Sequence, residues 1–304
     1  MFDCIVIGGG PAGMAASVYL ARQKMKFALF AGTLGGQVIW SSDVENYLGI
    51  HNITGVKLVE AFNRHLEDYK KAMELHEGEN VLKVVKTAGG FSLETDRGAY
   101  PTKTVLVATG ADHRKLGVPG EDQFNMKGIS YCANCDAPLF ADKIVHVVGG
   151  GNSAMDAALF LAKYAKEVHV ISINKELMGD EVMKRNCLKG ANIKMHFSTK
   201  TTGFTGGALL EAIGLVGPDG KEVSAPTEGV FIEIGLKPQS ELIDFLAKDK
   251  AGQIIVDSHN KTNVDGVWAA GDVTNVDYKQ IAVAVGEGSK ASLDIIRYLQ
   301  STQT

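Results

Sequence analysis

Cysteine is scarce in this chain of 304 residues, which contains only four. Cys4 and Cys187 are isolated, whereas Cys132 and Cys135 stand at Cys-x-x-Cys spacing. Four cysteines are too few for a structural disulfide framework and are typical of a reducing compartment. A zinc site needs four ligands, and one Cys-x-x-Cys without a second close pair does not supply them. We therefore predict no metal site, and inert packing roles for Cys4 and Cys187.

Long apolar runs and an excess of charge of one sign are also missing. No run of about 18 apolar residues occurs, and the N-terminus enters Phe2–Ile7 without a basic segment or a small-residue cleavage site. We expect a soluble, cytoplasmic protein that does not bind membranes. The formal net charge is −4, with basic and acidic residues interspersed. Without a basic stripe, nucleic acid is not expected as a partner.

Glycine, by contrast, is abundant, with 35 residues, and a glycine motif opens the chain. The apolar run Cys4–Ile7 is followed by Gly8-Gly-Gly10-Pro11-Ala12-Gly13 and a predicted helix over Met14–Arg22. In this strand–turn–helix pattern the first glycine allows the tight turn and the second lets the backbone approach a pyrophosphate. The third lets the helix pack close to the strand. The motif predicts a dinucleotide site, although the next strand, Phe27–Phe30, ends at Ala31-Gly32 without the acidic residue that an NAD ribose prefers.

A second glycine motif of the same kind lies near the middle of the chain. The predicted strand Lys143–Val148 leads into Gly149-Gly150-Gly151-Asn152-Ser153-Ala154 and a helix over Met155–Tyr164. Alanine takes the packing role of the third glycine here. Because both motifs occur in strand and helix context, a chance match is a poor explanation. The length of the chain also favours about two domains.

The remaining pattern predicts a mixed α/β chain. A polar, glycine-rich loop at 35–47 precedes a helix at 56–69, and three strands then form a β-meander that ends at Thr109-Gly110. A strand at 167–172, a hairpin around 218–220 and a strand at 229–234 follow the second motif. The chain closes with a strand at 262–270, Gly271-Asp272 and a helix at 279–299. By composition, Leu116–Gly120 and Gly235–Pro238 are candidate linkers.

Between the two glycine motifs lies the stretch Cys132-Ala-Asn-Cys135-Asp136. A Cys-x-x-Cys pair can close a small disulfide ring, and a helix starting at the second cysteine would favour thiolate. Asp136 follows directly and is within reach of a thiol proton. We interpret this stretch as a redox-active dithiol flanked by two nucleotide sites.

These motifs together carry a resemblance. The chain resembles low-molecular-weight thioredoxin reductases in the order of its motifs. These motifs are the two glycine motifs, Gly35-Gly36-Gln37, Val44-Glu-Asn46, Ala108-Thr109-Gly110, the Cys-x-x-Cys-Asp stretch, Ala269-Ala-Gly271-Asp272 and Lys279-Gln280-Ile281. The chain is also similar to the flavoprotein portion of bacterial alkyl hydroperoxide reductase. The resemblance implies two Rossmann-like three-layer nucleotide-binding domains, the second inserted in the first, each with a small β-meander.

The resemblance further implies a discontinuous FAD-binding domain, residues 1–114 and 240–304. A pyridine-nucleotide-type domain, residues 115–239, would carry the dithiol. A homodimer and a domain rotation are implied as well. The cofactor-binding residues expected from it are Gly8, Gly10, Pro11, Ala12, Gly13, Gly36, Gln37, Asn46, Val81, Thr109, Gly110, Gly271, Asp272, Lys279, Gln280 and Ile281, with Gly149, Gly151, Asn152, Ser153 and Ala154 in the second domain.

The activity implied is FAD-dependent protein-disulfide reduction. Electrons would pass from a donor through FAD to Cys132–Cys135 and on to thioredoxin or a glutaredoxin-like small dithiol protein. The catalytic residues would be Cys132, which attacks the partner's disulfide, Cys135, which faces the flavin, and Asp136, which manages the proton. Alternatives are an NADH oxidase, a reductase of a peroxiredoxin system that needs an external dithiol carrier, and a non-catalytic nucleotide sensor.

The electron donor is where this chain departs from the NADPH-dependent members of the family. Their His-Arg-Arg segment, which binds a 2′-phosphate, is replaced here by Ser172-Ile173-Asn174, and Met178 stands where a further arginine is expected. Without guanidinium groups a dianionic phosphate lacks its usual partners. Lys175, Lys184 and Arg185 are weaker substitutes that we interpret as a solvated helix face. NADH is therefore the first choice, with NADPH, reduced ferredoxin and a deazaflavin as alternatives.

Overall fold

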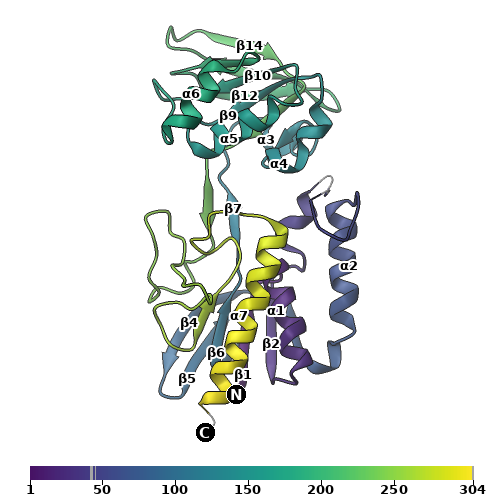
Figure 1. The fold of residues 1–304 in the computed structure, drawn as a ribbon, viewed down its shortest axis with the longest axis vertical. Coiled ribbons are helices and arrows are strands. Elements are labelled where there is room, and N and C mark those ends of the chain that lie inside the picture. The colour runs from purple at the N-terminus through teal and green to yellow at the C-terminus, as the bar shows by residue number, and fades with distance from the viewer. Residues whose placement is uncertain (42–43, 45, 303–304) are drawn as a thin grey trace. The chain divides into compact units, whose positions relative to one another are not determined.

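The computed structural model describes residues 1–41, 44 and 46–302, without the side chain of Trp40. The chain divides into two compact units, one formed by Met1–Asp112 with Lys237–Thr304 and the other by His113–Leu236. Two short strands, β7 (Ala111–His113) and β16 (Leu236–Pro238), carry the chain between the units and pair with each other (Figure 1). The expected linker at Leu116–Gly120 is wrong, because Leu116 and Val118 pack on the core of the second unit.

The first unit is built on a largely parallel sheet in the order β3-β2-β1-β6-β5-β4. The parallel strands are β1 (Phe2–Ile7), β2 (Phe27–Ala31), β3 (Glu74–Glu77) and β6 (Ala99–Val107), and β4 (Val81–Thr87) and β5 (Gly90–Thr95) complete the meander. β17 (Val267–Ala269) pairs with the last residues of β6, whereas β5 pairs with its first residues. β1, β2 and the end of β6 are apolar on both faces because both faces are covered.

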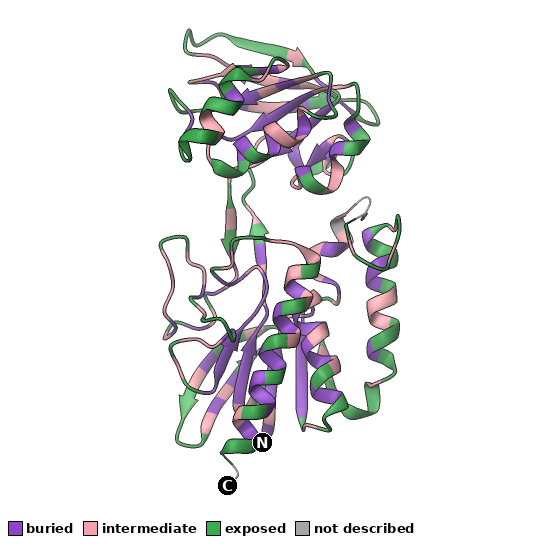
Figure 2. Cartoon of the chain, in the orientation of Figure 1, coloured by how far each residue is buried: buried purple, intermediate pink, exposed green. Residues whose placement is uncertain are grey.

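Two helices pack side by side on one face of this sheet (Figure 1). They are α1 (Pro11–Arg22) and α7 (Ile281–Ser301). Their backbones approach closely at Gly288, where an added Cβ would lie 2.0 Å from the Ala12 carbonyl oxygen. Figure 2 shows buried residues along both helices, and these residues share one core cluster with the strands. α7 begins at Ile281 rather than at Lys279, because Gln280 has extended backbone and caps the helix.

The second unit repeats the plan in three layers. Its sheet has the order β11-β10-β9-β15-β8, all parallel, from β8 (Ile129–Ser130), β9 (Ile144–Val148), β10 (Glu167–Ile171), β11 (Ile193–His196) and β15 (Gly229–Ile232). α5 (Asn152–Leu161) and α6 (Glu181–Lys189) cover one face. The meander β12 (Lys200–Gly206), β13 (Leu210–Val216) and β14 (Glu222–Pro226) covers the other. The predicted α/β class with two Rossmann-like units is confirmed.

The remaining helices and 3-10 turns complete the description. They are the helices α2 (Gly55–Glu67), α3 (Glu121–Phe124) and α4 (Ala133–Asp136) and the 3-10 turns η1 (Gly36–Trp40), η2 (Lys70–Ala72) and η3 (Ala137–Phe140). The strand expected over 262–270 is shorter, because the Thr262 hydroxyl donates to the Val267 carbonyl and closes a turn. Among the residues described, no helix is long and apolar enough to cross a bilayer.

Three histidines lie in a row across the second sheet. His146 of β9, His169 of β10 and His196 of β11 stack ring on ring, with centroids 4.7 and 5.1 Å apart. The Nδ1 atom of His146 lies 2.9 Å from the Thr227 hydroxyl, and Glu167 bonds both His169 and Lys194. Burial, with the charges of the neighbouring histidines, lowers the pKa of His146 to about 3. The pKa of His196 is lowered by burial and by the charges of His169 and Lys194.

This row predicts acid sensitivity of folding. In an unfolded chain His146 has a pKa of about 6.5, so below that pH the unfolded state binds more protons than the folded state. The free energy of unfolding should fall as the pH falls from about 6.5 toward 3, by up to about 1.4 kcal/mol per pH unit for this group. In H146N, whose amide can still bond Thr227, denaturant unfolding at several pH values should show a flatter dependence. An unchanged slope would contradict this role of His146.

Candidate redox and nucleotide-binding sites

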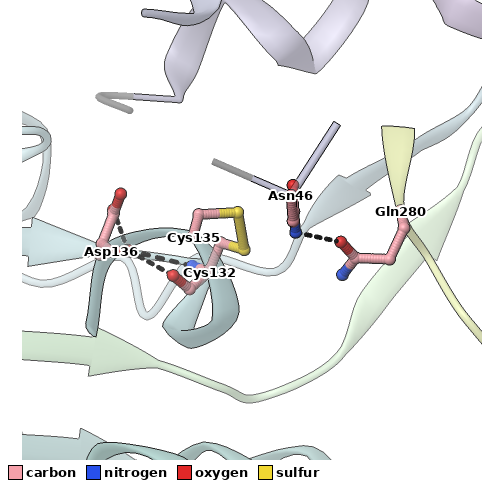
Figure 3. The surroundings of a disulfide bond; sticks show 6 residues. Asn46, Cys132, Cys135, Asp136 and Gln280 are labelled. Carbon is pink, nitrogen blue, oxygen red and sulfur yellow. Dashed lines mark hydrogen bonds between the residues drawn. A yellow bond between two sulfur atoms is a disulfide. The ribbon is translucent and has the colours of Figure 1, made fainter. Parts of the chain in front are cut away.

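The two central cysteines form a disulfide within the second unit (Figure 3). Their Cα atoms are 5.3 Å apart. Cys132 has extended backbone and is the N-cap of α4, and its carbonyl oxygen accepts the N–H groups of Cys135 and Asp136. The expectation that a helix starts at Cys135 is wrong, since α4 starts at Ala133 and contains the second cysteine. The pair therefore brackets the first turn of a short helix.

The Asp136 side chain is held by a serine that sequence reasoning missed. The Ser130 hydroxyl donates to Asp136 Oδ2 over 2.7 Å and accepts the Cys132 N–H over 3.0 Å. Ser130 ends β8 and is buried. One hydroxyl thus links the carboxylate to the backbone of the first cysteine. Nothing in the sequence marks Ser130 except its place two residues before Cys132.

Tyr131, which lies between Ser130 and Cys132 in the sequence, is held by a different partner, Glu121. Its hydroxyl donates to Glu121 Oε1 over 2.7 Å, and Glu121 also accepts the N–H groups of Leu116 and Gly117. Glu121 is only 3% exposed, so these three donors replace its lost hydration. Burial and the Glu121 carboxylate raise the pKa of Tyr131, which keeps the phenol protonated. The segment that precedes Cys132 is therefore held by the hydrogen bonds of Ser130 and Tyr131.

The second glycine motif forms the expected turn between β9 and α5. Gly149 has a φ of 149°, and an added Cβ would lie 2.3 Å from the Glu233 carbonyl oxygen. A Cβ at Gly150 would lie 2.3 Å from the Ser172 hydroxyl, whereas one at Gly151 would meet nothing within 4 Å. Gly151 is also the N-cap of α5 and receives no side-chain cap. The turn is tight at its base and open at the helix N-terminus.

Other predicted residues of this site lie on α5 and on the segment after β10. Ala154 is buried against Gly149, and the Asn152 side chain accepts the Asp180 N–H over 2.9 Å. Ser153 is exposed. Ile173 and Met178 are exposed by 74% and 54%. The two side chains therefore form an apolar surface on this segment. Lys184 forms an ion pair with Glu181, as expected for a solvated helix face.

Glu233 is a further residue that sequence reasoning missed. It follows β15, and its N–H donates to the Val148 carbonyl at the end of β9. Burial, together with the charge of Asp156 on α5, raises the pKa of Glu233 to about 8, and the hydrogen bond from the backbone N–H of Ala133 on α4 opposes the shift. The signal that could have found it is an acidic residue at the carboxyl end of a parallel strand.

In the first unit the glycine turn between β1 and α1 has the same character. Gly8 has a φ of 116°, and an added Cβ would lie 2.1 Å from the Ala108 carbonyl oxygen. A Cβ at Gly13 would lie 1.9 Å from the Gly8 carbonyl oxygen. At Gly10 it would meet nothing within 4 Å, and α1, with Pro11 and Ala12 in its first turn, has neither a side-chain cap nor an acidic residue there. Free N–H groups at an open helix start fit a bound pyrophosphate.

The carboxyl ends of β1, β6 and β17 meet at this turn, since β6 pairs with both other strands. Thr109 follows β6, and its hydroxyl donates to the Gln239 carbonyl before Gly110 turns the chain. Gly271 follows β17 and packs against Ala12. Parallel sheets bind ligands at this edge. The structure thus brings together the Gly8–Gly13, Thr109-Gly110 and Gly271-Asp272 motifs of the predicted site.

Three ionisable residues, Asp272, Lys279 and Glu287, lie near this edge of the sheet. Glu287 on α7 accepts the Gly271 N–H over 2.8 Å, and the Lys279 ammonium donates to the Thr274 carbonyl over 2.6 Å. Burial raises the pKa of Asp272, against the effect of Lys279, and burial also lowers the pKa of Lys279. Glu287 was not predicted from the sequence, although it lies next to Gly288 on α7. It fixes the backbone next to Asp272.

Most of the remaining predicted residues of the first unit lie near η1 and the start of α7, whereas Val81 does not. Gly36 starts η1 close to Gly10, with Gln37 beside it, and Asn46 donates to the Gln280 side chain over 3.1 Å (Figure 3). Ile281 packs on a small core cluster with η1 and α2. Val81 instead begins β4 and packs on the meander side of the sheet. Asp43 and Glu45 of the polar loop, and the side chain of Trp40, lie outside the described residues.

Three comparisons with known proteins agree with this geometry. An alkyl hydroperoxide reductase subunit of Xanthomonas campestris pv. phaseoli is 40% identical over 99% of this chain, and an NADH dehydrogenase of Bacillus subtilis (strain 168) is 37% identical over 98%. The chain spans 58% of the length of each of these relatives. The crystal structure of thioredoxin reductase from Streptococcus pyogenes MGAS5005 superimposes with a TM-score of 0.91 at 33% identity, covering 99% of both chains.

A family model supplies the remaining comparison. Residues 2–288 match the model of the pyridine nucleotide-disulphide oxidoreductases, so the match includes both glycine turns and the disulfide. That family implies a flavin and a pyridine nucleotide, and the two open helix starts fit two such groups. The chain therefore belongs to the pyridine nucleotide-disulphide oxidoreductase family.

Proposed function

We propose that the protein is a FAD-dependent protein-disulfide reductase of thioredoxin reductase type. Electrons from a donor would reach the Cys132–Cys135 disulfide and then thioredoxin or a similar small dithiol protein. The observation that carries the proposal is the disulfide around the first turn of α4, with a carboxylate held beside it, in a chain with two open glycine turns. The similarity to thioredoxin reductase structures over almost the whole chain supports it.

In this proposal FAD lies at the first glycine turn. Gly8, Gly10 and Gly13 would hold its pyrophosphate at the start of α1, and Asp272 would bind a hydroxyl group. Gln37, Asn46 and Gln280 would lie along the ring. When bound, FAD takes an electron pair from a donor and passes it to a disulfide, which a dithiol alone does not achieve with a nicotinamide. The second turn, Gly149–Gly151, would hold the pyridine nucleotide.

The residues of the chain then manage protons and thiol exchange. Reduction of the disulfide consumes two electrons and two protons and gives two thiols. Asp136, which accepts a hydrogen bond from Ser130, would accept and return a proton of one thiol. The Cys132 thiolate attacks the partner's disulfide, which gives a mixed disulfide and one released thiol. Cys135 then attacks Cys132 to release the second thiol and restore the disulfide.

NADH is the proposed donor. A 2′-phosphate would face Ser172, Ile173 and Met178, none of which carries a positive charge. The Bacillus subtilis relative, an NADH dehydrogenase, supports the same choice. Reduced ferredoxin is an alternative donor, and a homodimer is the proposed assembly.

A second candidate function is reduction of a peroxiredoxin system. It is favoured by the 40% identity to an alkyl hydroperoxide reductase subunit, of which this chain spans 58%. The same disulfide would then reduce a separate dithiol carrier rather than thioredoxin. Both candidates use Cys132, Cys135 and Asp136 in the same way, so only the protein partner separates them.

Gly10 offers a test of the FAD site. Its backbone, with a φ of −76°, suits alanine, and the space around it is open. G10A should keep the unfolding free energy of the apoprotein within about 0.5 kcal/mol, because nothing is displaced. It should weaken FAD binding by about tenfold or more, since the methyl group occupies the place of the pyrophosphate. Fluorescence titration of the apoprotein with FAD measures this. G89A, in the open turn between β4 and β5, is the control, and equal affinities of the two variants would refute the assignment.

The function itself is tested with anaerobic assays of the holoenzyme. NADH, NADPH and reduced ferredoxin are compared as donors, and the protein disulfides of thioredoxin and of a peroxiredoxin system as acceptors. NADH should bleach the flavin at the lowest concentration, and thioredoxin disulfide should then be reduced. The C132S/C135S variant should keep flavin reduction by NADH but lose disulfide reduction by about 100-fold or more, because the thiol relay is gone.

The outcomes of these assays are distinct. Disulfide reduction that survives in C132S/C135S would refute the proposal. Oxygen consumption that survives there, without disulfide reduction by the wild type, would indicate a flavin oxidase instead. Reduction of the peroxiredoxin carrier but not of thioredoxin would favour the second candidate.

A further inference from the structure

Three neighbouring parallel strands of the second unit end in three different chemical features. β8 leads into the disulfide, β9 leads into the glycine turn, and β15, which lies between them, leads into Glu233. The register places Phe231 of β15 opposite both Ser130 and Val147. Because parallel strands end at a common edge, Glu233 stands between the disulfide and the glycine turn.

Contacts on both sides confirm this placement. The Glu233 backbone touches Gly149, whose hypothetical Cβ would lie 2.3 Å from its carbonyl oxygen. The backbone N–H of Ala133, the residue after Cys132, donates a hydrogen bond to the Glu233 carboxyl group. α4 and α5 also pack against each other. Glu233 thus contacts the helix that carries the redox pair and the turn proposed for the nucleotide.

We propose that Glu233 is a positioning residue for the Cys132–Cys135 couple, and that the charge of its carboxyl group sets how many protons the disulfide takes up on reduction. The inference rests on the proposed function, since it concerns the same disulfide. Glu233 acts through the first turn of α4.

The proton balance explains the effect. Reduction with two electrons and two protons gives two thiols, and with one proton it gives a thiol and a thiolate. A neutral Glu233 near the start of α4 leaves a thiolate there unopposed, whereas a carboxylate repels it. Burial holds Glu233 protonated at neutral pH, with its pKa raised to about 8. Ionisation of Glu233 therefore makes the one-proton reduction less favourable.

Few charged groups face Glu233. Asp156 approaches it from α5 and raises its pKa, and the Ala133 N–H from α4 opposes this. Asp136, also on α4, is bonded to Ser130. The glycine turn contributes backbone but no side-chain charge. Asp156 is therefore the one described side chain whose removal should shift the titration of Glu233.

The test is the thiol–disulfide equilibrium of the holoenzyme with dithiothreitol, from about pH 6 to about pH 10, read by alkylation and mass. Wild type and E233Q should agree below about pH 7, where Glu233 is neutral. Above about pH 8 the disulfide of E233Q should be easier to reduce, by about tenfold at the alkaline end. In D156N, Glu233 should ionise at a lower pH than in wild type. The equilibrium curve of D156N should therefore separate from that of E233Q at a lower pH than the wild-type curve does.

E211Q, at an exposed carboxylate on β13, is the matched control and should follow wild type. Superimposable curves for wild type and E233Q, with thioredoxin still reduced by wild type, would overturn the inference and leave the function standing. An equal offset at every pH would also overturn it, because the effect would then be structural and not one of charge. Divergence without any reduction of protein disulfides would refute the proposed function alone.

Discussion

The structure depends on one constraint, which is that parallel strands deliver their carboxyl ends to a single edge of a sheet. In the second unit this constraint brings the disulfide, Glu233 and the Gly149 turn together, although they lie far apart in the sequence. In the first unit it brings Gly8, Thr109 and Gly271 together. Each unit presents at this edge an open helix start, a feature that fits an anion such as a phosphate.

A small number of hydrogen bonds and charges fix the residues around the disulfide. Ser130 fixes Asp136, Glu121 fixes Tyr131, and Asp156 acts on Glu233. These acids have different surroundings. Glu121 accepts three hydrogen bonds, whereas burial raises the pKa of Glu233 despite the hydrogen bond from the Ala133 N–H. The short helix α4 and the residues before it thus lie among three carboxyl groups, those of Asp136, Glu121 and Glu233, each with different partners.

Much of this could be predicted from the sequence because the signals are local. The glycine motifs need only their own strand, turn and helix, and the cysteine spacing predicts a small ring. The α/β class follows from the same local patterns. The misplaced start of α4 was a local error, since the Cys132 carbonyl accepts two N–H groups and so starts the helix earlier.

The features that were missed depend on distant pairings. Ser130, Glu233 and Glu287 gain their roles from partners on other elements, which a pattern of hydrophobicity does not reveal. β12 and β3 were missed for the same reason, since mixed polar strands are stabilised by their neighbours. The expected linker at Leu116–Gly120 has the composition of a loop, yet Glu121 and the core hold it in the second unit.

The central claim is that a flavin and the Cys132–Cys135 pair exchange electrons within one chain. Anaerobic titration with dithionite, followed by flavin absorbance, tests it most directly. Wild type should take up about four electrons per FAD, two in the flavin and two in the disulfide, and C135S should take up about two. Equal uptake by the two proteins would contradict the account.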